Sequence, residues 1–105
     1  NKVYAKADKG PYYMGGKPAF DKFLKANLKY PAEALAIKKT GVVVVSFIVE
    51  KIGGITNIEV IQGIGYGCDE EAIRLVRKMP KWIPGTVEGK TIRVIHKVSI
   101  NFPLE

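Results

Sequence analysis

Hydrophobic positions in the first third of the chain follow a helical spacing. Over 18–28, four apolar side chains recur at positions i, i+3, i+4 and i+8, which predicts an amphipathic helix. The stripe consists of Phe20, Phe23, Leu24 and Leu28. Pro31 opens a second, shorter helical segment that ends before Gly41. Because proline disfavours the helical conformation of the residue before it, we expect Tyr30 to be extended at a corner between the two helices.

The middle and the end of the chain change to spacings typical of strands. Residues 41–50 are dominated by β-branched side chains, and 55–62 return after Gly53-Gly54 as the second strand of a hairpin. Residues 91–102 form a long last strand. The positions expected to face the core are Val43, Val45, Phe47 and Val49 on the first strand and Ile92, Val94, Val98, Ile100 and Phe102 on the last. The opposite face of the first strand is also largely apolar, so we expect the N-terminal residues to cover it.

A third helix is predicted over 68–79, between the hairpin and the last strand. Asp69 suits the N-cap position, and Glu70 and Arg74 have the i, i+4 spacing of a helical ion pair. The apolar stripe of this helix consists of Ala72, Leu75, Val76 and Met79.

The order helix, helix, strand, strand, helix, strand predicts an α+β fold. We expect a three-stranded antiparallel sheet, made of the hairpin 41–62 and the last strand 91–102, with helices packed on one face. A right-handed crossover through the third helix places the first strand at the centre and the last strand at an edge. Residues 1–16 are expected to be an irregular lead-in, and 17–105 one globular domain.

The chain has one tryptophan, Trp82, between Pro80 and Pro84 and shortly before Gly85. Pro80 ends the third helix and Pro84 stiffens the approach to the last strand. An indole at this crossing buries a large apolar area if it closes the end of the core. We therefore interpret these four residues as a structural signature, with Trp82 buried.

The amino-acid composition excludes some classes of protein but leaves several kinds of binding partner open. A chain of 105 residues forms one domain, and no apolar run is long enough to span a bilayer. Its 17 basic and 10 acidic residues give a net charge of +7, which suits nucleic acid, an anionic surface or an acidic peptide. The lysines are scattered along the chain, as on a solvated basic surface.

No group of residues predicts an active site. The glycines of 63–67 precede Asp69, Glu70 and Glu71, whose charges oppose a bound pyrophosphate. His96 falls on a core-facing position, and Cys68 has no second cysteine with which to form a disulfide or a zinc site. We predict a non-enzymatic domain without a cofactor.

Several segments, in their order, resemble the C-terminal domain of TonB-type energy-transducing proteins. The matching segments, which together span 27–102, are NLKYPAEAL, GVVVVSFIVEKIGGITNIEVIQG, DEEAIRLVRKMPKWIPG and IRVIHKVSINF. The Tyr-Pro corner and the Met-Pro-x-Trp-x-Pro-Gly run carry most of the specificity of this resemblance. The segment GGKPAFDKFLKANLKYP also resembles the extended front end of Bacteroidetes versions.

This resemblance implies a periplasmic domain, anchored to the inner membrane by a segment upstream of this chain. It implies that the domain binds the TonB box, a short extended peptide of TonB-dependent outer-membrane transporters, and transmits force from a proton-driven inner-membrane motor complex. The contact residues it implies are Tyr30, Pro31, Ile92, Arg93, Val94, Ile95, Lys97 and Ser99. We expect the peptide to add to the sheet edge as a strand, attracted by the basic residues there.

Two departures from the family pattern concern that edge. His96 stands where relatives usually have a larger apolar or aromatic residue, and residues 99–101 lack a proline that many relatives have before the isoleucine. Two other functions compete with the transducer. One is a sensing or docking domain appended to a membrane metallopeptidase-type sensor. The other is a basic nucleic-acid-binding domain, which we disfavour because the phenylalanines are assigned to the core and leave no stacking platform.

Overall fold

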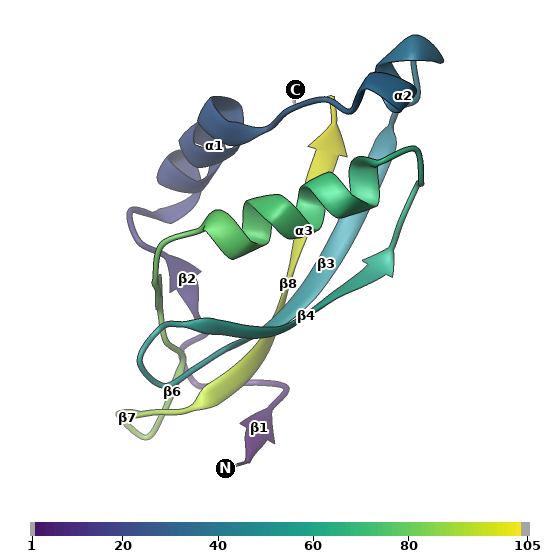
Figure 1. Ribbon diagram of the computed structural model, residues 1–105. Coiled ribbons are helices and arrows are strands. Elements are labelled where there is room, and N and C mark those ends of the chain that lie inside the picture. The colour runs from purple at the N-terminus through teal and green to yellow at the C-terminus, as the bar shows by residue number, and fades with distance from the viewer. Residues whose placement is uncertain (1, 104–105) are drawn as a thin grey trace.

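A computed structural model, which describes residues 2–103, shows an α+β fold with helices packed against a twisted sheet (Figure 1). The helices are α1 (Gly16–Asn27), α2 (Ala32–Ala36) and α3 (Cys68–Lys78). The long strands are β3 (Gly41–Val49), β4 (Ile55–Gln62) and β8 (Arg93–Phe102). The two-residue strands are β1 (Val3–Tyr4), β2 (Tyr12–Tyr13), β5 (Trp82–Ile83), β6 (Thr86–Val87) and β7 (Lys90–Thr91). The predicted fold class is confirmed.

The three predicted antiparallel strands are present, with β3 in the centre. β3 pairs with β8 from Gly41 opposite Phe102 to Val49 opposite Val94, and it pairs with β4 on its other side. The pairing of β3 with β4 is irregular near Asn57, which has a positive φ of 51°. β3 is thus paired along both of its sides.

The prediction that the last strand forms the sheet edge is wrong over its first residues. The sheet has the order β1-β8-β3-β4, and β1 pairs in parallel with Arg93 and Val94 of β8. From Ile95 to Phe102, no strand in the described part of the chain pairs with the outer side of β8. Residues 1–16 were expected to be irregular, and their sequence does not indicate this pairing because it joins Val3 and Tyr4 to residues far away in the chain.

We expected the lead-in to cover the second face of β3, but the strand pairings of its β1 and β2 are with other elements. The lead-in pairs through its backbone with the segment after α3, with Tyr12 opposite Ile83 and Tyr13 opposite Trp82. Lys9 exchanges backbone hydrogen bonds with Thr86. The side chain of Tyr13 is buried and belongs to the hydrophobic core.

The core lies between α1, α3 and the sheet. The predicted core face of β3 is confirmed, since Val43, Val45, Phe47 and Val49 are fully buried. The predicted stripe of α3 and the core-facing positions of β8 are buried as well, with His96 only half-buried. Met79, just before Pro80, is extended and ends α3, as proline requires of the residue before it.

Two local predictions about α3 are wrong. Its N-cap is Gly67, with a left-handed φ of 84°, and Asp69 lies inside the helix. The Asp69 carboxylate instead accepts hydrogen bonds from the backbone N–H groups of Ile64 and Gly65, at 2.9 and 3.2 Å. A Cβ at Gly63 would lie 2.1 Å from an Asp69 oxygen, so a side chain at this position would displace the carboxylate from its hydrogen-bonded place. The predicted Glu70–Arg74 pair is replaced by a pair between Arg74 and Glu71.

Candidate functional site

The open outer side of β8, from Ile95 onward, is the strongest candidate site in the described part of the chain. Backbone groups on this side have no strand partner there, so an extended peptide can pair with them. Ile95, Lys97 and Ser99, all predicted contact residues, expose their side chains along this stretch. Ile92 and Val94 are 8% and 3% exposed and offer no side-chain surface.

Arg93 lies at the covered end of β8 and is engaged in an ion pair. Its Nε lies 2.6 Å from Oε1 of Glu50, the residue after β3. The hydrogen bonds from Arg93 and from Thr56 lower the pKa of Glu50 below its ordinary value. Because this charge is compensated, Arg93 contributes less than expected to the attraction of an acidic peptide.

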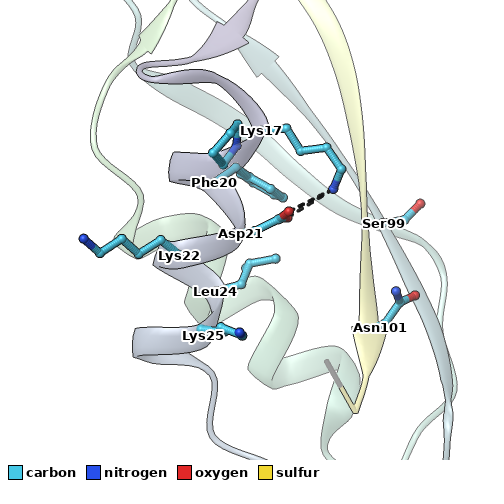
Figure 2. Close-up of a pocket in the computed structure, with 9 residues that line it drawn as sticks. Lys17, Phe20, Asp21, Lys22, Leu24, Lys25, Ser99 and Asn101 are labelled. Atoms are coloured by element: carbon cyan, nitrogen blue, oxygen red, sulfur yellow. Dashed lines mark hydrogen bonds and ion pairs between the residues drawn. The ribbon is translucent and has the colours of Figure 1, made fainter. Parts of the chain in front are cut away.

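Beside the open stretch lies a pocket of about 710 Å³ between α1 and β8, which we call the polar pocket. Its walls include Lys17, Asp21 and Lys25 from α1 and Ser99 and Asn101 from β8. Lys17 and Asp21 form an exposed ion pair at 3.1 Å, and Figure 2 shows Lys17 reaching toward β8. α1 thus forms a second wall that runs next to the unpaired side of the strand.

A second pocket of about 400 Å³, which we call the aromatic pocket, adjoins the first. Its lining includes Tyr12, Tyr13, Phe20, Trp82, His96 and Val98. The two pockets share Lys17, Phe20 and Ser99, so they form one continuous groove beside β8. We call the two together the α1–β8 groove.

Trp82 lies at the base of the groove and is buried, as predicted. The indole is 4% exposed and makes edge contacts with four rings, at centroid distances of 5.1 to 6.1 Å. These rings are Tyr13, Phe20, Phe47 and His96. Its Nε1 is buried with no hydrogen-bond acceptor among the described residues. Burial lowers the pKa of His96, which keeps the imidazole neutral at pH 7.

The predicted Tyr30-Pro31 corner lies at the other end of β8. Tyr30 is partly buried, and its ring contacts Phe102 at a centroid distance of 6.0 Å. Its hydroxyl donates a hydrogen bond to the Lys39 carbonyl, and Pro31 caps α2. At about 3.3 Å per residue, the corner and Arg93 are separated by about 30 Å of strand. The predicted contact residues therefore spread along the strand and do not form one compact patch.

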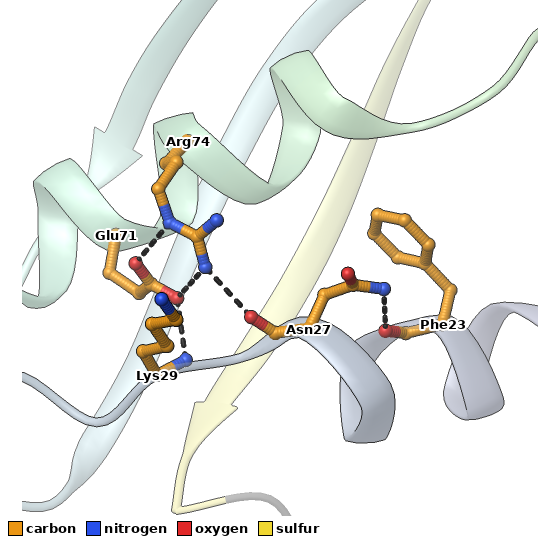
Figure 3. Close-up of polar contacts among 5 residues, drawn as sticks. All are labelled: Phe23, Asn27, Lys29, Glu71 and Arg74. Atoms are coloured by element: carbon orange, nitrogen blue, oxygen red, sulfur yellow. Dashed lines mark hydrogen bonds and ion pairs between the residues drawn. The ribbon is translucent and has the colours of Figure 1, made fainter.

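An ion pair that sequence reasoning missed holds this corner in place (Figure 3). Arg74 of α3 donates to both carboxylate oxygens of Glu71 and to the Asn27 carbonyl, each at 2.7 Å. Glu71 also accepts a hydrogen bond from the Lys29 backbone N–H at 2.7 Å. Glu71 is three residues after the buried Cys68 and four before Leu75, so its place on the apolar stripe was the available signal.

Within residues 2–103, the structure does not support a nucleotide site at the glycine-rich loop or a metal site. Asp69 already occupies backbone amides of the glycine-rich loop, which a phosphate would need. Residues 2–103 contain no group of three or more side chains that could hold a metal ion. Over the same residues, no helix is long and apolar enough to cross a membrane.

Comparison with known proteins identifies the family. The model of the Gram-negative bacterial TonB protein C-terminal family matches residues 26–104. No curated protein and no solved structure matches the chain. Domains of this family are non-enzymatic, act in the periplasm and transfer energy to TonB-dependent outer-membrane transporters. With the strand order, the Tyr-Pro corner and the buried Trp82 already in place, this match shows that the chain belongs to the TonB C-terminal family.

Proposed function

We propose that this domain binds the TonB box of an outer-membrane transporter along β8, from Ile95 to Asn101, as an added strand. The observation that carries the proposal is the unpaired outer side of β8 in a chain of this family. Strand addition uses backbone hydrogen bonds for affinity and side-chain pockets for selectivity. The predicted contacts Arg93 and Val94 then mark the limit of the site, because β1 pairs with them.

The surroundings of β8 suit an acidic extended peptide. The chain carries a net charge of +7, and Lys97 and Lys25 are exposed on the strand and on α1. Tyr30 packs against Phe102 at the end of the strand, which supports a contact between the Tyr30-Pro31 corner and a peptide that extends beyond Asn101. Several strand hydrogen bonds loaded in shear resist force together. This property suits a domain that transmits force from a proton-driven inner-membrane motor complex through an N-terminal anchor.

The test is a titration of the ¹⁵N-labelled domain with TonB-box peptides of transporters from the same organism. We expect amide shifts concentrated on Ile95 to Asn101. Peptides N-methylated at alternate residues test the strand geometry, because only one of the two alternating sets of amides faces β8. One set of N-methyl groups should abolish binding and the other should leave it unchanged.

β4 is the internal control, since it lies at the opposite edge of the sheet. Shifts confined to β4 or to α3 would overturn the proposal. Binding of single-stranded DNA with a steep decrease in affinity at higher salt would favour the nucleic-acid alternative. A filter-binding titration of the same domain measures this.

A further inference from the structure

The α1–β8 groove joins a family strand to a wall from outside the family match. β8 lies within the matched residues 26–104, whereas nearly all of α1 and the whole lead-in precede them. The N-terminal residues thus add side chains to one flank of the open strand. A flank of this kind decides which peptide side chains fit beside the strand.

We propose that the α1–β8 groove selects peptides that carry an apolar side chain for the aromatic pocket and an acidic side chain for Lys25. This inference rests on the proposed function, since it assumes that a peptide strand pairs with β8. It goes further by naming two side chains of the peptide and their order along the strand.

The aromatic pocket carries the first half of the selection. Its volume of about 400 Å³ lies at the small end of the range of roughly 300–1,000 Å³ typical of ligand pockets. Three rings, those of Tyr13, Phe20 and Trp82, form much of its wall, and Tyr12 is 54% exposed at its rim. An apolar side chain on the strand next to His96 and Val98 would be removed from water here.

Lys25 carries the second half. Lys17, the other α1 lysine that faces β8, already pairs with Asp21. Lys25 has no ion-pair partner within residues 2–103 and lines the polar pocket with Ser99 and Asn101. A carboxylate on the peptide beside Ile100, on the core-facing side of β8, would therefore meet an uncompensated cation across the groove.

The register of β8 sets the spacing of the two side chains. The aromatic pocket lies against residues 96–99 and the polar pocket against 99–101. The α1 side of β8 is its core-facing side, which carries His96, Val98 and Ile100. Ser99 and Asn101 alternate with these residues, and Figure 2 shows their side chains directed away from α1. Peptide side chains beside His96, Val98 and Ile100 share the α1 side and recur every two residues. The apolar and acidic residues of the peptide are therefore two or four positions apart.

Labelled heptapeptides, capped at both ends, test this by fluorescence anisotropy. The reference peptides are ETVTLTA and its reversed sequence ATLTVTE, which cover both strand directions. For the tighter of the two, we expect replacement of Glu by Gln to weaken binding about 3-fold and replacement of Leu by Ser about 10-fold. Equal affinity of all variants would overturn the inference.

Protein variants with matched controls assign each effect to its wall. Lys25→Glu should weaken binding of the reference peptide about 5-fold, and replacing the peptide Glu by Lys should restore it. Lys90→Glu makes the same charge change in β7, at the end of the molecule opposite α1 (Figure 1), and should have a smaller effect. An equal loss in both variants would overturn the role of Lys25.

The apolar half is tested with Tyr12→Ala. Tyr12 is 54% exposed, and so is Ile61 on β4, outside the groove, which makes Ile61→Ala the control. Tyr12→Ala should weaken the reference peptide about 5-fold and leave the Leu-to-Ser peptide unchanged, whereas Ile61→Ala should change neither. An equal effect on both peptides would overturn the pocket assignment.

If TonB-box peptides shift the amides of β8 but the heptapeptide variants bind alike, only this inference fails. If no peptide of either kind shifts those amides, the proposed function fails as well.

Discussion

Trp82 shows how one side chain connects the sheet, α1 and the lead-in. Its ring contacts join Phe47 of β3, Phe20 of α1 and Tyr13 of β2. Its backbone N–H donates to the Gly53 carbonyl at 2.9 Å, and a Cβ at Gly53 would lie 2.3 Å from the Trp82 carbonyl oxygen. The hairpin turn and the segment after α3 therefore pack backbone to backbone, which requires glycine at position 53.

We predict that Trp82→Ala lowers the free energy of unfolding by about 3–5 kcal/mol, because it leaves a large cavity. Trp82→Phe should cost much less, since the Nε1 of Trp82 has no acceptor among the described residues and no such hydrogen bond is lost. Urea unfolding of both variants measures the difference. Wild-type stability of Trp82→Ala, or equal losses in the two variants, would contradict this account.

At the scale of elements, α3 holds the connection between α1 and α2 through a partly buried ion pair. Glu71 is 9% exposed, and Arg74 reaches from it to the Asn27 carbonyl. Burial raises the pKa of Glu71, but the hydrogen bonds from Arg74 and from the Lys29 N–H outweigh it, and the pKa is lowered overall. The position of Tyr30 next to Phe102 depends on this anchor, because residues 28–31 contain no helix or strand.

We predict that Glu71→Gln lowers the free energy of unfolding by about 2 kcal/mol at neutral pH. A carboxylate with a lowered pKa in the folded state stabilises the fold above its ordinary pKa, 4.5, and loses this contribution as the pH falls below that value. The difference between wild type and Glu71→Gln should therefore shrink on acidification from about pH 7 to about pH 3. Urea unfolding across this pH range measures it.

The matched control is Glu70→Gln, which removes the same charge from an exposed neighbour in the same helical turn. We expect it to change stability by less than about 0.5 kcal/mol. An effect as large as that of Glu71→Gln would indicate that the charge at the helix N-terminus matters, and not the anchor.

In the molecule as a whole, the N-terminal strand β1 pairs with the first two residues of β8, and the two chain ends lie at opposite ends of the sheet (Figure 1). β1 covers only the first two residues of β8, and the rest of the strand stays open beside α1. The molecule is elongated, with principal extents of 49, 24 and 18 Å. Because β1 pairs only with Arg93 and Val94, the unpaired stretch of β8 begins at Ile95.

We predict that a chain starting at Ala7, which lacks β1, extends the peptide-binding stretch of β8. In the titration with TonB-box peptides, amide shifts should then include Arg93 and Val94, whose outer side β1 covers in the full chain. Tyr13 and its pairing with Trp82 remain in this variant, so the core is retained. Circular dichroism is the control for folding, and an unchanged set of shifted amides would contradict the prediction.

Much of the candidate site could be predicted from the sequence. The alternation of 91–102 predicted the last long strand, which the structure has at Arg93–Phe102, and Trp82 is buried as expected. The α1 wall of the groove was not predicted, because a stripe of apolar residues shows that α1 packs but not which strand it lies beside. The ion pair of Glu71 with Arg74 was missed because an acidic residue near a helix N-terminus is also explained by its favourable interaction with the helix dipole.

Local spacing was enough to predict the helices, the three long strands and their buried faces, because it decides which side chains can share one face of a helix or strand. The sequence by itself also determined the family, through motifs whose order matches that of the TonB C-terminal domain. Three features are seen only in the folded chain: β1 pairs with β8, Tyr13 packs on Trp82 and α1 borders the open strand. Each of these contacts joins segments distant in sequence, and their pairing depends on how the whole chain is packed, which no local pattern encodes.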